Sequence, residues 1–242
     1  MPRGALRYLR DLRRFRSSGN SLALRLHPCL HDWWEQAGAV DNEYFWQDLF
    51  VARMVYAAAP QHHVDVGSRL DGFVAHVASF RQIEVFDVRP LKSSISGITF
   101  RQADMMKAEQ VPLEHADSAS CLHAIEHFGL GRYGDPIEAD GVALGMKSLA
   151  RLLKPGGVLY LSCPLGPDEV SFNAHRSLSP ETLIDIAAKE GLETTRAWLF
   201  DSATKVFDSL PLPRITGSPI KYSRFTLALY LMRKPSAQDE QP

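Results

Sequence analysis

The chain contains little cysteine and no long apolar segment. Its three cysteines, Cys29, Cys121 and Cys163, lie far apart and form no CxxC pair, and an odd count argues against a disulfide framework. The nearest candidate for a membrane span, FTLALYLM near the C-terminus, is far shorter than the roughly 18 residues that crossing a bilayer requires. The N-terminus also lacks the apolar core of a secretory signal. We therefore expect a cytoplasmic protein in a reducing compartment.

The net charge is close to zero, since the chain has 27 basic and 28 acidic residues, but the charges are unevenly distributed. The first 16 residues contain six arginines and one acid, Asp11. In a helical conformation, Leu6, Leu9, Leu12 and Phe15 would recur beside these arginines, which suits an amphipathic helix at an anionic membrane or a partner surface. The alternative is an arm with solvated charges that is either flexible or docked on the core. We expect no nucleic-acid binding, because the rest of the chain supplies no basic stripe or aromatic platform.

A glycine turn after a short apolar segment is the most informative local signal. The run HVDVGS predicts a strand that ends before Gly67, Gly72 follows five residues later, and IEVFD predicts a second strand that ends at Asp87. Such a turn brings backbone N–H groups close to a ligand, and an acid about 20 residues further on can bind a ribose diol. An ordinary strand-to-helix turn also uses glycine, but the acid after the second strand favours an adenosine-containing cofactor.

The predicted elements continue in α/β order. The segment ITFRQADM predicts a third strand followed by Asp104, and DSASCLHAIEH predicts a fourth strand that leads into a polar loop. Residues 140–153 predict a helix before the KPGG turn and an apolar fifth strand, VLYLSCP. A chain of 242 residues with 45% hydrophobic content can bury a large core as one α/β domain.

This order of strands and acids resembles the class I S-adenosylmethionine-dependent methyltransferases over about residues 45–232. The strings DVGSRLDGFVAH, HAIEHFGLGRYGD and FNAHR also resemble a small family of uncharacterised methyltransferase-like proteins, known as a domain of unknown function. The resemblance implies a doubly wound, mostly parallel seven-stranded sheet, the Rossmann-like methyltransferase fold, with an N-terminal helical extension. It places strand six near residues 191–200 and an antiparallel final strand near residues 224–232.

The resemblance also implies S-adenosylmethionine as the cofactor. In the methyltransferase family the first turn contacts the methionine part, the acid after the second strand binds the ribose, and the acid after the third contacts adenine. The predicted cofactor-binding residues are Asp65, Gly67, Ser68, Asp87, Asp104, Met105 and His123.

The candidate catalytic residues follow the fourth and fifth strands. Ligands of open α/β sheets bind outside the carboxyl ends of the strands, so HAIEHFGLGRYGD is expected where cofactor and acceptor meet. His127 is the first candidate for a general base, because imidazole titrates near neutral pH. Glu126 is expected to orient His127 or to bind the acceptor, and His175 is the second candidate base. In class I methyltransferases this Glu-His pair serves structure or cofactor contact as readily as catalysis.

An acceptor site is expected beside these residues. Arg132 or Arg176 is expected to bind a carboxylate or phosphate, which the guanidinium fork matches well. Tyr133 and Asn173 complete the predicted acceptor site.

Two further motif matches lack their usual context. His123, Glu126 and His127 spell HxxEH, a zinc-protease pattern that requires both histidines on one helix. Glycines 129, 131 and 134 spell GxGxxG, but the strand that follows does not end in an acid. We expect no bound metal and a flexible loop at these glycines.

We expect three parts in the chain. A basic arm and helical extension cover residues 1–40, a methyltransferase-like domain covers residues 41–234, and a disordered tail covers residues 235–242. The segment before the first strand is rich in aromatic residues and predicts a helical cap. Its aromatic side chains either line the acceptor pocket or pack against the sheet; they are Trp33, Trp34, Tyr44, Phe45 and Trp46.

The predicted function is S-adenosylmethionine-dependent methyl transfer to oxygen or nitrogen of a small molecule or a glycan precursor. The glycan hypothesis rests on the basic arm and the polar loop. The alternative is a catalytically inactive module that either binds S-adenosylmethionine or S-adenosylhomocysteine or serves as an interaction module. A nicotinamide oxidoreductase is disfavoured, because no Tyr-Lys pair lies near the fifth strand and the glycine turn suits a pyrophosphate poorly.

Overall fold

The computed structural model describes residues 4–19, 21–38, 40–210 and 226–236 of the chain. The chain forms two compact units, Met1–Asn42 and Glu43–Pro242. Of the predicted tail, only residues 235 and 236 are among the described residues, and the first two residues of the predicted final strand lie outside them. None of the described helices combines the length and apolarity needed to cross a membrane.

The N-terminal unit contains one helix and one short turn. These elements are α1, Ala5–Ser17, and the 3-10 turn Asp32–Trp34. Alanine, leucine and arginine, which favour helices, make up most of α1. The Arg7 guanidinium lies over the Trp33 ring and pairs with Asp11 at 3.3 Å. Because Leu6 and Leu9 remain exposed, the helix presents apolar and basic groups together, as the leucine spacing predicted.

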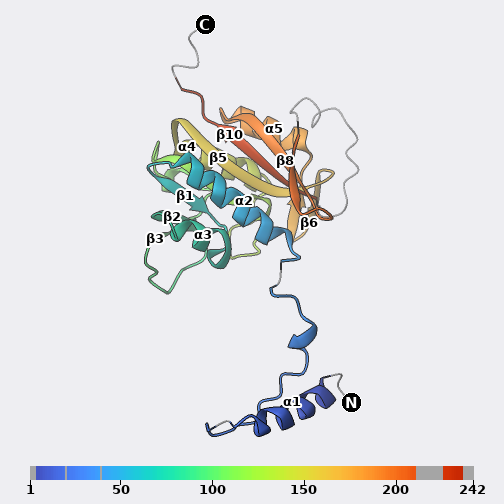
Figure 1. Cartoon of the computed structure of the whole chain (residues 1–242). Helices are drawn as coiled ribbons and strands as arrows, with labels where there is room; N and C mark the ends of the chain where they lie inside the picture. The colour runs from blue at the N-terminus through green and yellow to red at the C-terminus, as the bar shows by residue number, and fades with distance from the viewer. Residues whose placement is uncertain (1–3, 20, 39, 211–225, 237–242) are drawn as a thin grey trace. The chain divides into compact units, whose positions relative to one another are not determined.

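The Glu43–Pro242 unit is built on an eight-stranded sheet with the order β3-β2-β1-β4-β5-β10-β8-β9 (Figure 1). The strands are β1 His63–Val66, β2 Ile83–Asp87, β3 Ile98–Gln102, β4 Ala116–Leu122, β5 Leu153–Leu165, β8 Glu193–Asp201, β9 Val206–Leu210 and β10 Thr226–Arg233. Strands β1 to β5 pair in parallel, and β10 pairs antiparallel with both β5 and β8. The predicted fold class is confirmed, and β9 adds an eighth strand because the chain folds back after β8.

Helices cover both faces of this sheet. They are α2 Glu43–Ala58, α3 Ala75–Ala78, α4 Gly141–Leu152 and α5 Pro180–Lys189. One apolar cluster joins α4 and α5 to one face, and a second joins α2 and α3 to the other (Figure 1). Alternation along β5 explains the division, since Leu159 and Leu161 belong to the first cluster and Tyr160 to the second. The two layers hold the ends of the parallel strands rigidly, which positions the loops that follow them.

Two short elements depart from regular helix and sheet. A π-helical turn, Leu70–Val74, precedes α3, and Gly72 within it has non-helical backbone angles. A separate hairpin joins β6, Glu169–Ser171, to β7, His175–Ser177.

Candidate functional site

A cavity of about 340 Å³ lies at the carboxyl edge of the parallel strands. Residues that follow successive strands line it, among them Gly67 after β1, Asp87 at the end of β2 and His123 after β4. Open α/β sheets bind their ligands at this edge, because the loops of neighbouring strands diverge there. The volume lies within the range of small-molecule sites.

The turn after β1 requires glycine at its first position. Gly67 has φ +70°, a left-handed conformation that costs other L-residues about 1–2 kcal/mol. A Cβ at this position would lie only 2.9 Å from the Cβ of Ala124. The Gly67 N–H donates to the carbonyl of Phe86 at 2.9 Å. Glycine therefore lets the turn pack closely against the segment after β4 at the cavity wall.

Asp65 and Ser68 support this turn from inside the protein. The buried Asp65 carboxylate accepts from the Ser68 N–H at 3.0 Å, the Ser68 hydroxyl at 2.6 Å and the Ser120 hydroxyl at 2.5 Å. The Ser68 hydroxyl in turn accepts from the Leu122 N–H. Burial raises the pKa of Asp65 to about 7. Both residues, predicted to bind cofactor, thus lie behind the cavity wall and position the turn.

Asp87 lines the cavity, but its carboxylate already has an internal partner. Arg89 donates to it through the backbone N–H at 2.8 Å, Nε at 3.0 Å and Nη2 at 2.6 Å. An ionised carboxylate has about four lone-pair sites, so it can still accept from a ribose diol. The Arg89 guanidinium also lies 4.6 Å from the centroid of the Tyr133 ring. Arg89, which the sequence did not single out, thereby links the acid after β2 to the loop after β4.

Asp104 and Met105 follow β3 and line the same cavity. The Asp104 Oδ1 accepts from the Met106 N–H at 3.0 Å, and Lys107 Nζ lies 3.7 Å from Oδ2. Among the described residues, no group donates a hydrogen bond to the buried Oδ2. A buried acceptor without a donor costs free energy, so Asp104 is available to a ligand that carries a donor such as an exocyclic amine.

His123 and Glu126 form a polar wall of the cavity after β4. Glu126 is buried, and its Oε1 accepts from His123 Nδ1 at 3.1 Å. His123 has φ +50°, a conformation that non-glycine residues seldom adopt and that clusters at functional sites. His123 Nε2 and Glu126 Oε2 are buried without a hydrogen-bond partner in the described part of the chain. Both atoms can therefore bind polar groups of a ligand.

His127 has the protonation pattern of a potential base. Its Nδ1 lies 2.7 Å from the carbonyl oxygen of Ala174, which can only accept, so Nδ1 carries the proton and Nε2 the lone pair when the ring is neutral. Burial lowers the pKa of His127 below its ordinary 6.5, although the charge of Glu126, 3.7 Å from Nε2, acts in the opposite direction. The ring is therefore neutral at pH 7 with a lone pair on Nε2, as a general base requires.

Helix α2 supplies polar lining residues that the sequence analysis missed. Gln47 and Asp48 both line the cavity although they are buried. The Ser162 hydroxyl donates to Gln47 Oε1 at 2.5 Å, and Gln47 Nε2 donates to Asp48 Oδ1 at 3.1 Å. Burial raises the pKa of Asp48. The available signal was a polar pair inside an otherwise apolar helix, EYFWQDLFVARM.

Of the five aromatic residues predicted to line the pocket or pack against the sheet, Tyr44 is among the cavity-lining residues. Tyr44 lines the cavity with its ring 4.7 Å from that of His123, and burial raises its pKa. The rings of Phe45 and Trp46 contact each other at 5.4 Å. Trp33 and Trp34 belong to the N-terminal unit, where their side chains are largely exposed.

Asp135 binds several backbone groups of the glycine-rich loop after β4, which the sequence predicts to be flexible. Asp135 Oδ2 accepts from the N–H groups of Gly129 at 2.8 Å and Gly131 at 3.2 Å, and Oδ1 accepts from Tyr133 at 3.1 Å. Glycines 129, 131 and 134 all have positive φ. The GxGxxG match therefore reflects the turns of this loop. In the HxxEH match, Glu126 and His127 lie on a 3-10 turn, Ile125–His127, whereas His123 precedes it, so the two histidines do not share one helix.

Three of the residues predicted around the acceptor meet at the cavity. Arg132, Tyr133 and His175 line it, and Arg132 Nη1 donates to the carbonyl of Ala174 at 2.8 Å. Asn173 instead lies in the turn between β6 and β7 with an exposed side chain.

Arg176 also lies away from the cavity. Its buried guanidinium donates to the carbonyls of Phe128, Glu138 at 3.0 Å and Ala139 at 3.2 Å. Successive residues of a strand point to opposite faces, so His175 reaches the cavity while Arg176 points to the protein interior. Arg176 therefore anchors the loop that carries Arg132 and Tyr133. No local pattern in the sequence distinguishes this role from acceptor binding.

The cavity has features that fit S-adenosylmethionine. The Gly67 turn allows close backbone approach, Asp87 can accept from a diol, and Asp104 Oδ2 lacks a donor. The unpartnered His123 Nε2 and Glu126 Oε2 add polar groups on the side of β4. Along the sheet edge, Asp104, Asp87 and Gly67 lie at or just after the ends of β3, β2 and β1 in turn. This order matches a ligand with a base, a ribose and a charged amino acid in sequence.

Comparison with known proteins agrees with this fold. The family described as "Caenorhabditis protein of unknown function, DUF268" matches residues 66–187. No curated protein sequence matches the chain.

Solved structures share the architecture at low sequence identity. The 1,6-didemethyltoxoflavin-N1-methyltransferase of Burkholderia thailandensis, with bound 1,6-didemethyltoxoflavin and S-adenosylhomocysteine, is 13% identical with a TM-score of 0.55, over 98% of this chain and 91% of its own. The N-methyltransferase NodS of Bradyrhizobium japonicum is 14% identical with a TM-score of 0.54, over 78% of this chain and 95% of its own. The cyclase SpnF is 18% identical with a TM-score of 0.54, over 97% and 95%. The similarity confirms the class I methyltransferase fold.

Proposed function

Because this chain belongs to the DUF268 family of unknown function and has the class I methyltransferase fold, we propose that it is an S-adenosylmethionine-dependent methyltransferase. The observation that carries the proposal is the meeting of Gly67, Asp87, Asp104 and His127 in one cavity. A glycine turn, two acids after neighbouring strands and a neutral imidazole are the groups that the cofactor and a proton-bearing acceptor require.

The cofactor-binding part of the proposal assigns roles along the sheet edge. Asp87 accepts from the ribose hydroxyls, Asp104 accepts from the adenine amine, and Met105 packs beside the base. The Gly67 turn, which Asp65 and Ser68 support, contacts the amino-acid part. His123 adds the free Nε2 near that part.

His127 is the proposed general base. S-adenosylmethionine supplies, when bound, a methyl group on a sulfonium that is open to in-line displacement. When an acceptor oxygen or nitrogen displaces the sulfur from the methyl carbon, His127 Nε2 would take the proton that the acceptor loses. Glu126, 3.7 Å away, stabilises the imidazolium that results. His175 is the second candidate for this role.

The proposed acceptor is a small molecule or a glycan precursor with a hydroxyl or amine. The Arg132 guanidinium at the cavity suits a carboxylate or phosphate, and Tyr133 offers a ring for packing. The toxoflavin methyltransferase with the same fold binds a small molecule together with S-adenosylhomocysteine, which supports a small acceptor.

The test is methyl release from radiolabelled S-adenosylmethionine by the full chain, with and without a panel of small hydroxyl and amine acceptors. We expect turnover that the acceptor stimulates. His127→Gln should bind the cofactor normally but turn over about 100-fold more slowly, which is the usual scale of general base catalysis. His27→Gln, at an exposed position of the N-terminal unit, is the control and should match the native rate.

An inactive cofactor-binding module is the alternative, because the fold alone does not specify methyl transfer: SpnF shares it and is named a cyclase. Tight binding of S-adenosylhomocysteine with no methyl release from S-adenosylmethionine under any condition would favour that alternative.

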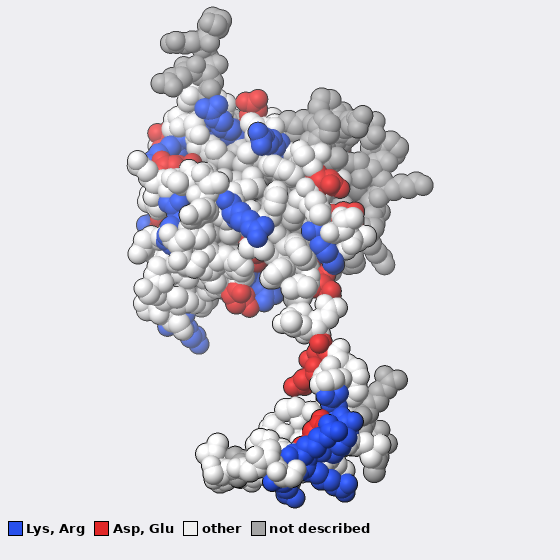
Figure 2. All heavy atoms as spheres, viewed as in Figure 1, with Lys and Arg blue, Asp and Glu red and all other residues white. Residues whose placement is uncertain are grey.

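We also propose that α1 contacts an anionic membrane surface. Figure 2 shows the Lys and Arg side chains gathered on this helix, which carries five arginines and one acid. Leu6 and Phe15 are 70% and 48% exposed. An arginine near an anionic surface contributes roughly 1 kcal/mol.

Vesicle sedimentation tests this contact. We expect binding to phosphatidylserine vesicles that Arg13→Glu/Arg14→Glu abolishes and that Arg53→Glu/Lys189→Glu, an equal charge change on exposed positions of the other unit, leaves intact. Equal binding to uncharged vesicles would contradict the proposal.

A further inference from the structure

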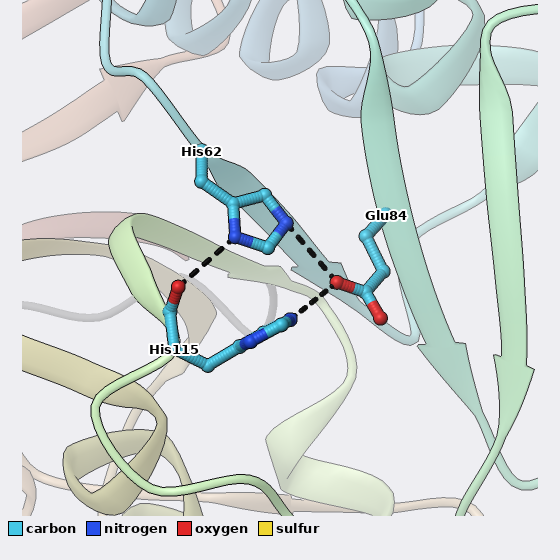
Figure 3. Close-up of side chains that lie close together, drawn as sticks. All are labelled: His62, Glu84 and His115. Atoms are coloured by element: carbon cyan, nitrogen blue, oxygen red, sulfur yellow. Dashed lines mark hydrogen bonds and ion pairs between the residues drawn. The ribbon is translucent and has the colours of Figure 1, made fainter.

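Two histidines and a glutamate converge at the amino-terminal edge of the sheet. His62 Nε2 lies 3.1 Å and His115 Nε2 lies 2.7 Å from the same oxygen, Glu84 Oε2 (Figure 3). Among the described residues, they are the one group of three His, Cys, Asp or Glu side chains whose ligand atoms lie within 4.8 Å of one another. The methyltransferase account uses none of them.

The fold brings these side chains together from three separate segments. His62 precedes β1, His115 precedes β4, and Glu84 is the second residue of β2. Because β1 pairs with both β2 and β4, the starts of the three strands are neighbours. This edge is opposite to the one that carries the cavity, since the cavity lies at the carboxyl ends of the same strands.

The backbone of the cluster is held in place. The His62 N–H donates to Asp117 Oδ2 at 2.9 Å, and the His115 N–H donates to the carbonyl of Leu152 at 2.8 Å. Arg101 Nη2 lies 3.7 Å from the other oxygen of Glu84. The backbone that carries His62 and His115 is therefore held in place at the starts of β1 and β4.

The hydrogen bonds of His62 require a positive charge beside Glu84. His62 Nδ1 lies 3.0 Å from the carbonyl oxygen of His115, which only accepts, so Nδ1 must carry a proton. In the neutral ring Nε2 then has a lone pair, yet it points at Glu84 Oε2, which is also an acceptor. Either a proton on Nε2 or a metal ion between the two atoms supplies the positive charge that resolves this conflict.

The donor set indicates which cation fits. Two imidazole nitrogens and one carboxylate oxygen are typical zinc ligands, with bonds of about 2.0–2.2 Å, whereas calcium and magnesium prefer oxygen ligands alone. The bond from His62 Nδ1 to a backbone carbonyl is the partner that a metal-ligating histidine usually has on its other nitrogen. The side chains of His62 and His115 are 36% and 31% exposed, which leaves room for a water as fourth ligand.

We propose that His62, Glu84 and His115 bind one divalent transition-metal ion, with Zn²⁺ as the best fit. The ion binds through Nε2 of each histidine and one oxygen of Glu84, and it joins the starts of β1, β2 and β4. Its place at the edge opposite to the cavity gives it a role in stability, independent of methyl transfer. The sequence predicts no metal site here, because the three ligands lie far apart along the chain.

The test is calorimetric titration of the metal-free full chain with Zn²⁺, together with thermal unfolding. We expect one ion per chain, a rise in Tm with Zn²⁺, and a loss of affinity of at least about 100-fold in His115→Ala and Glu84→Gln. Glu84→Gln keeps the side-chain shape, so it tests the site even where His115→Ala fails to fold.

A double variant, His27→Ala/Cys29→Ser, is the control, because it removes an exposed histidine and the exposed thiol of the N-terminal unit. It should bind Zn²⁺ as the native chain does, and a Co²⁺ complex of the native chain should show no thiolate charge-transfer band. No stoichiometric binding, or binding that survives Glu84→Gln and is lost in the control, would overturn the proposal. Failure of cofactor binding would leave this outcome unaffected.

Discussion

The structure allows an estimate of how much unfolding free energy Gly67→Ala costs. The new residue must adopt φ +70°, which costs about 1–2 kcal/mol. Its Cβ would also lie 2.9 Å from the Cβ of Ala124, and overpacking of this kind adds about 1–3 kcal/mol. The expected loss of unfolding free energy is therefore about 2–5 kcal/mol. The push on Ala124 also displaces the neighbouring His123 at the cavity wall.

Gly191→Ala is a matched control for the backbone term. Gly191 has φ +73° but a Cβ there would meet nothing within 4 Å, so this variant should lose only about 1–2 kcal/mol and bind S-adenosylhomocysteine normally. Gly67→Ala should lose more stability and at least about tenfold in affinity. Gly67→Ala/Ala124→Gly, which removes the contact, should regain part of that affinity.

Urea unfolding and calorimetric titration measure the two quantities on the same three variants. The reasoning is refuted if Gly67→Ala is no less stable than Gly191→Ala, or if it binds S-adenosylhomocysteine as tightly as the native chain. The first result would deny the close packing of the turn, and the second would deny that the turn contacts the cofactor.

Three further predictions follow from buried charges and their partners. Burial raises the folded pKa of Asp65 from 3.8 to about 7, so the folded state holds this proton more tightly than the unfolded state does. The free energy of unfolding should therefore fall as pH rises from about 4 to 7, by up to about 4 kcal/mol. Urea unfolding of Asp65→Asn across this window should show a weaker fall. Arg176→Lys should lower the free energy of unfolding by about 1–3 kcal/mol, since it loses hydrogen bonds to buried carbonyls. It should also raise the KM for a working acceptor, because the loop that carries Arg132 loses its anchor. An unchanged KM would contradict the anchoring role. Because the pKa of His127 lies below 6.5, the acid limb of the pH–rate profile should fall below pH 6.5, and a limb above that value would exclude His127 as the base.

Local patterns in the sequence predicted much of the fold. Apolar runs that end at Gly67 and Asp87 place the first two parallel strands, since each strand end is marked by a residue type that the backbone or a ligand requires. The KPGG segment, predicted as a turn before strand five, instead lies within β5, Leu153–Leu165. The added strand β9 was missed, because its short polar and apolar mixture, VFDSL, resembles a loop.

The candidate site was most predictable where its residues lie at or just after strand ends. Asp87 and Asp104 lie at such positions, so sequence order alone brings them to the cavity. Gln47 and Asp48 reach it through the packing of α2, which no local pattern specifies. Arg176 differs from His175 only by the face of a short strand, which cannot be read before the hairpin is known.

Side-chain contacts that no local pattern specifies explain the remaining differences. Asp135 accepts from three backbone N–H groups of the glycine-rich loop, and glycine content alone gives no sign of this. The cluster of His62, Glu84 and His115 arises from strand order in the sheet, so it became visible only in three dimensions.

The most direct test of the cofactor assignment is calorimetric titration of the full chain with S-adenosylhomocysteine, beside Asp87→Asn and Asp71→Asn. Asp71 also pairs with an arginine two residues away, Arg69, but its carboxylate is 72% exposed, so it serves as a matched control. We predict micromolar binding that Asp87→Asn weakens at least about tenfold, which corresponds to about 1.4 kcal/mol, and that Asp71→Asn leaves unchanged. Absence of binding in the native chain, or equal binding by all three proteins, would contradict the account.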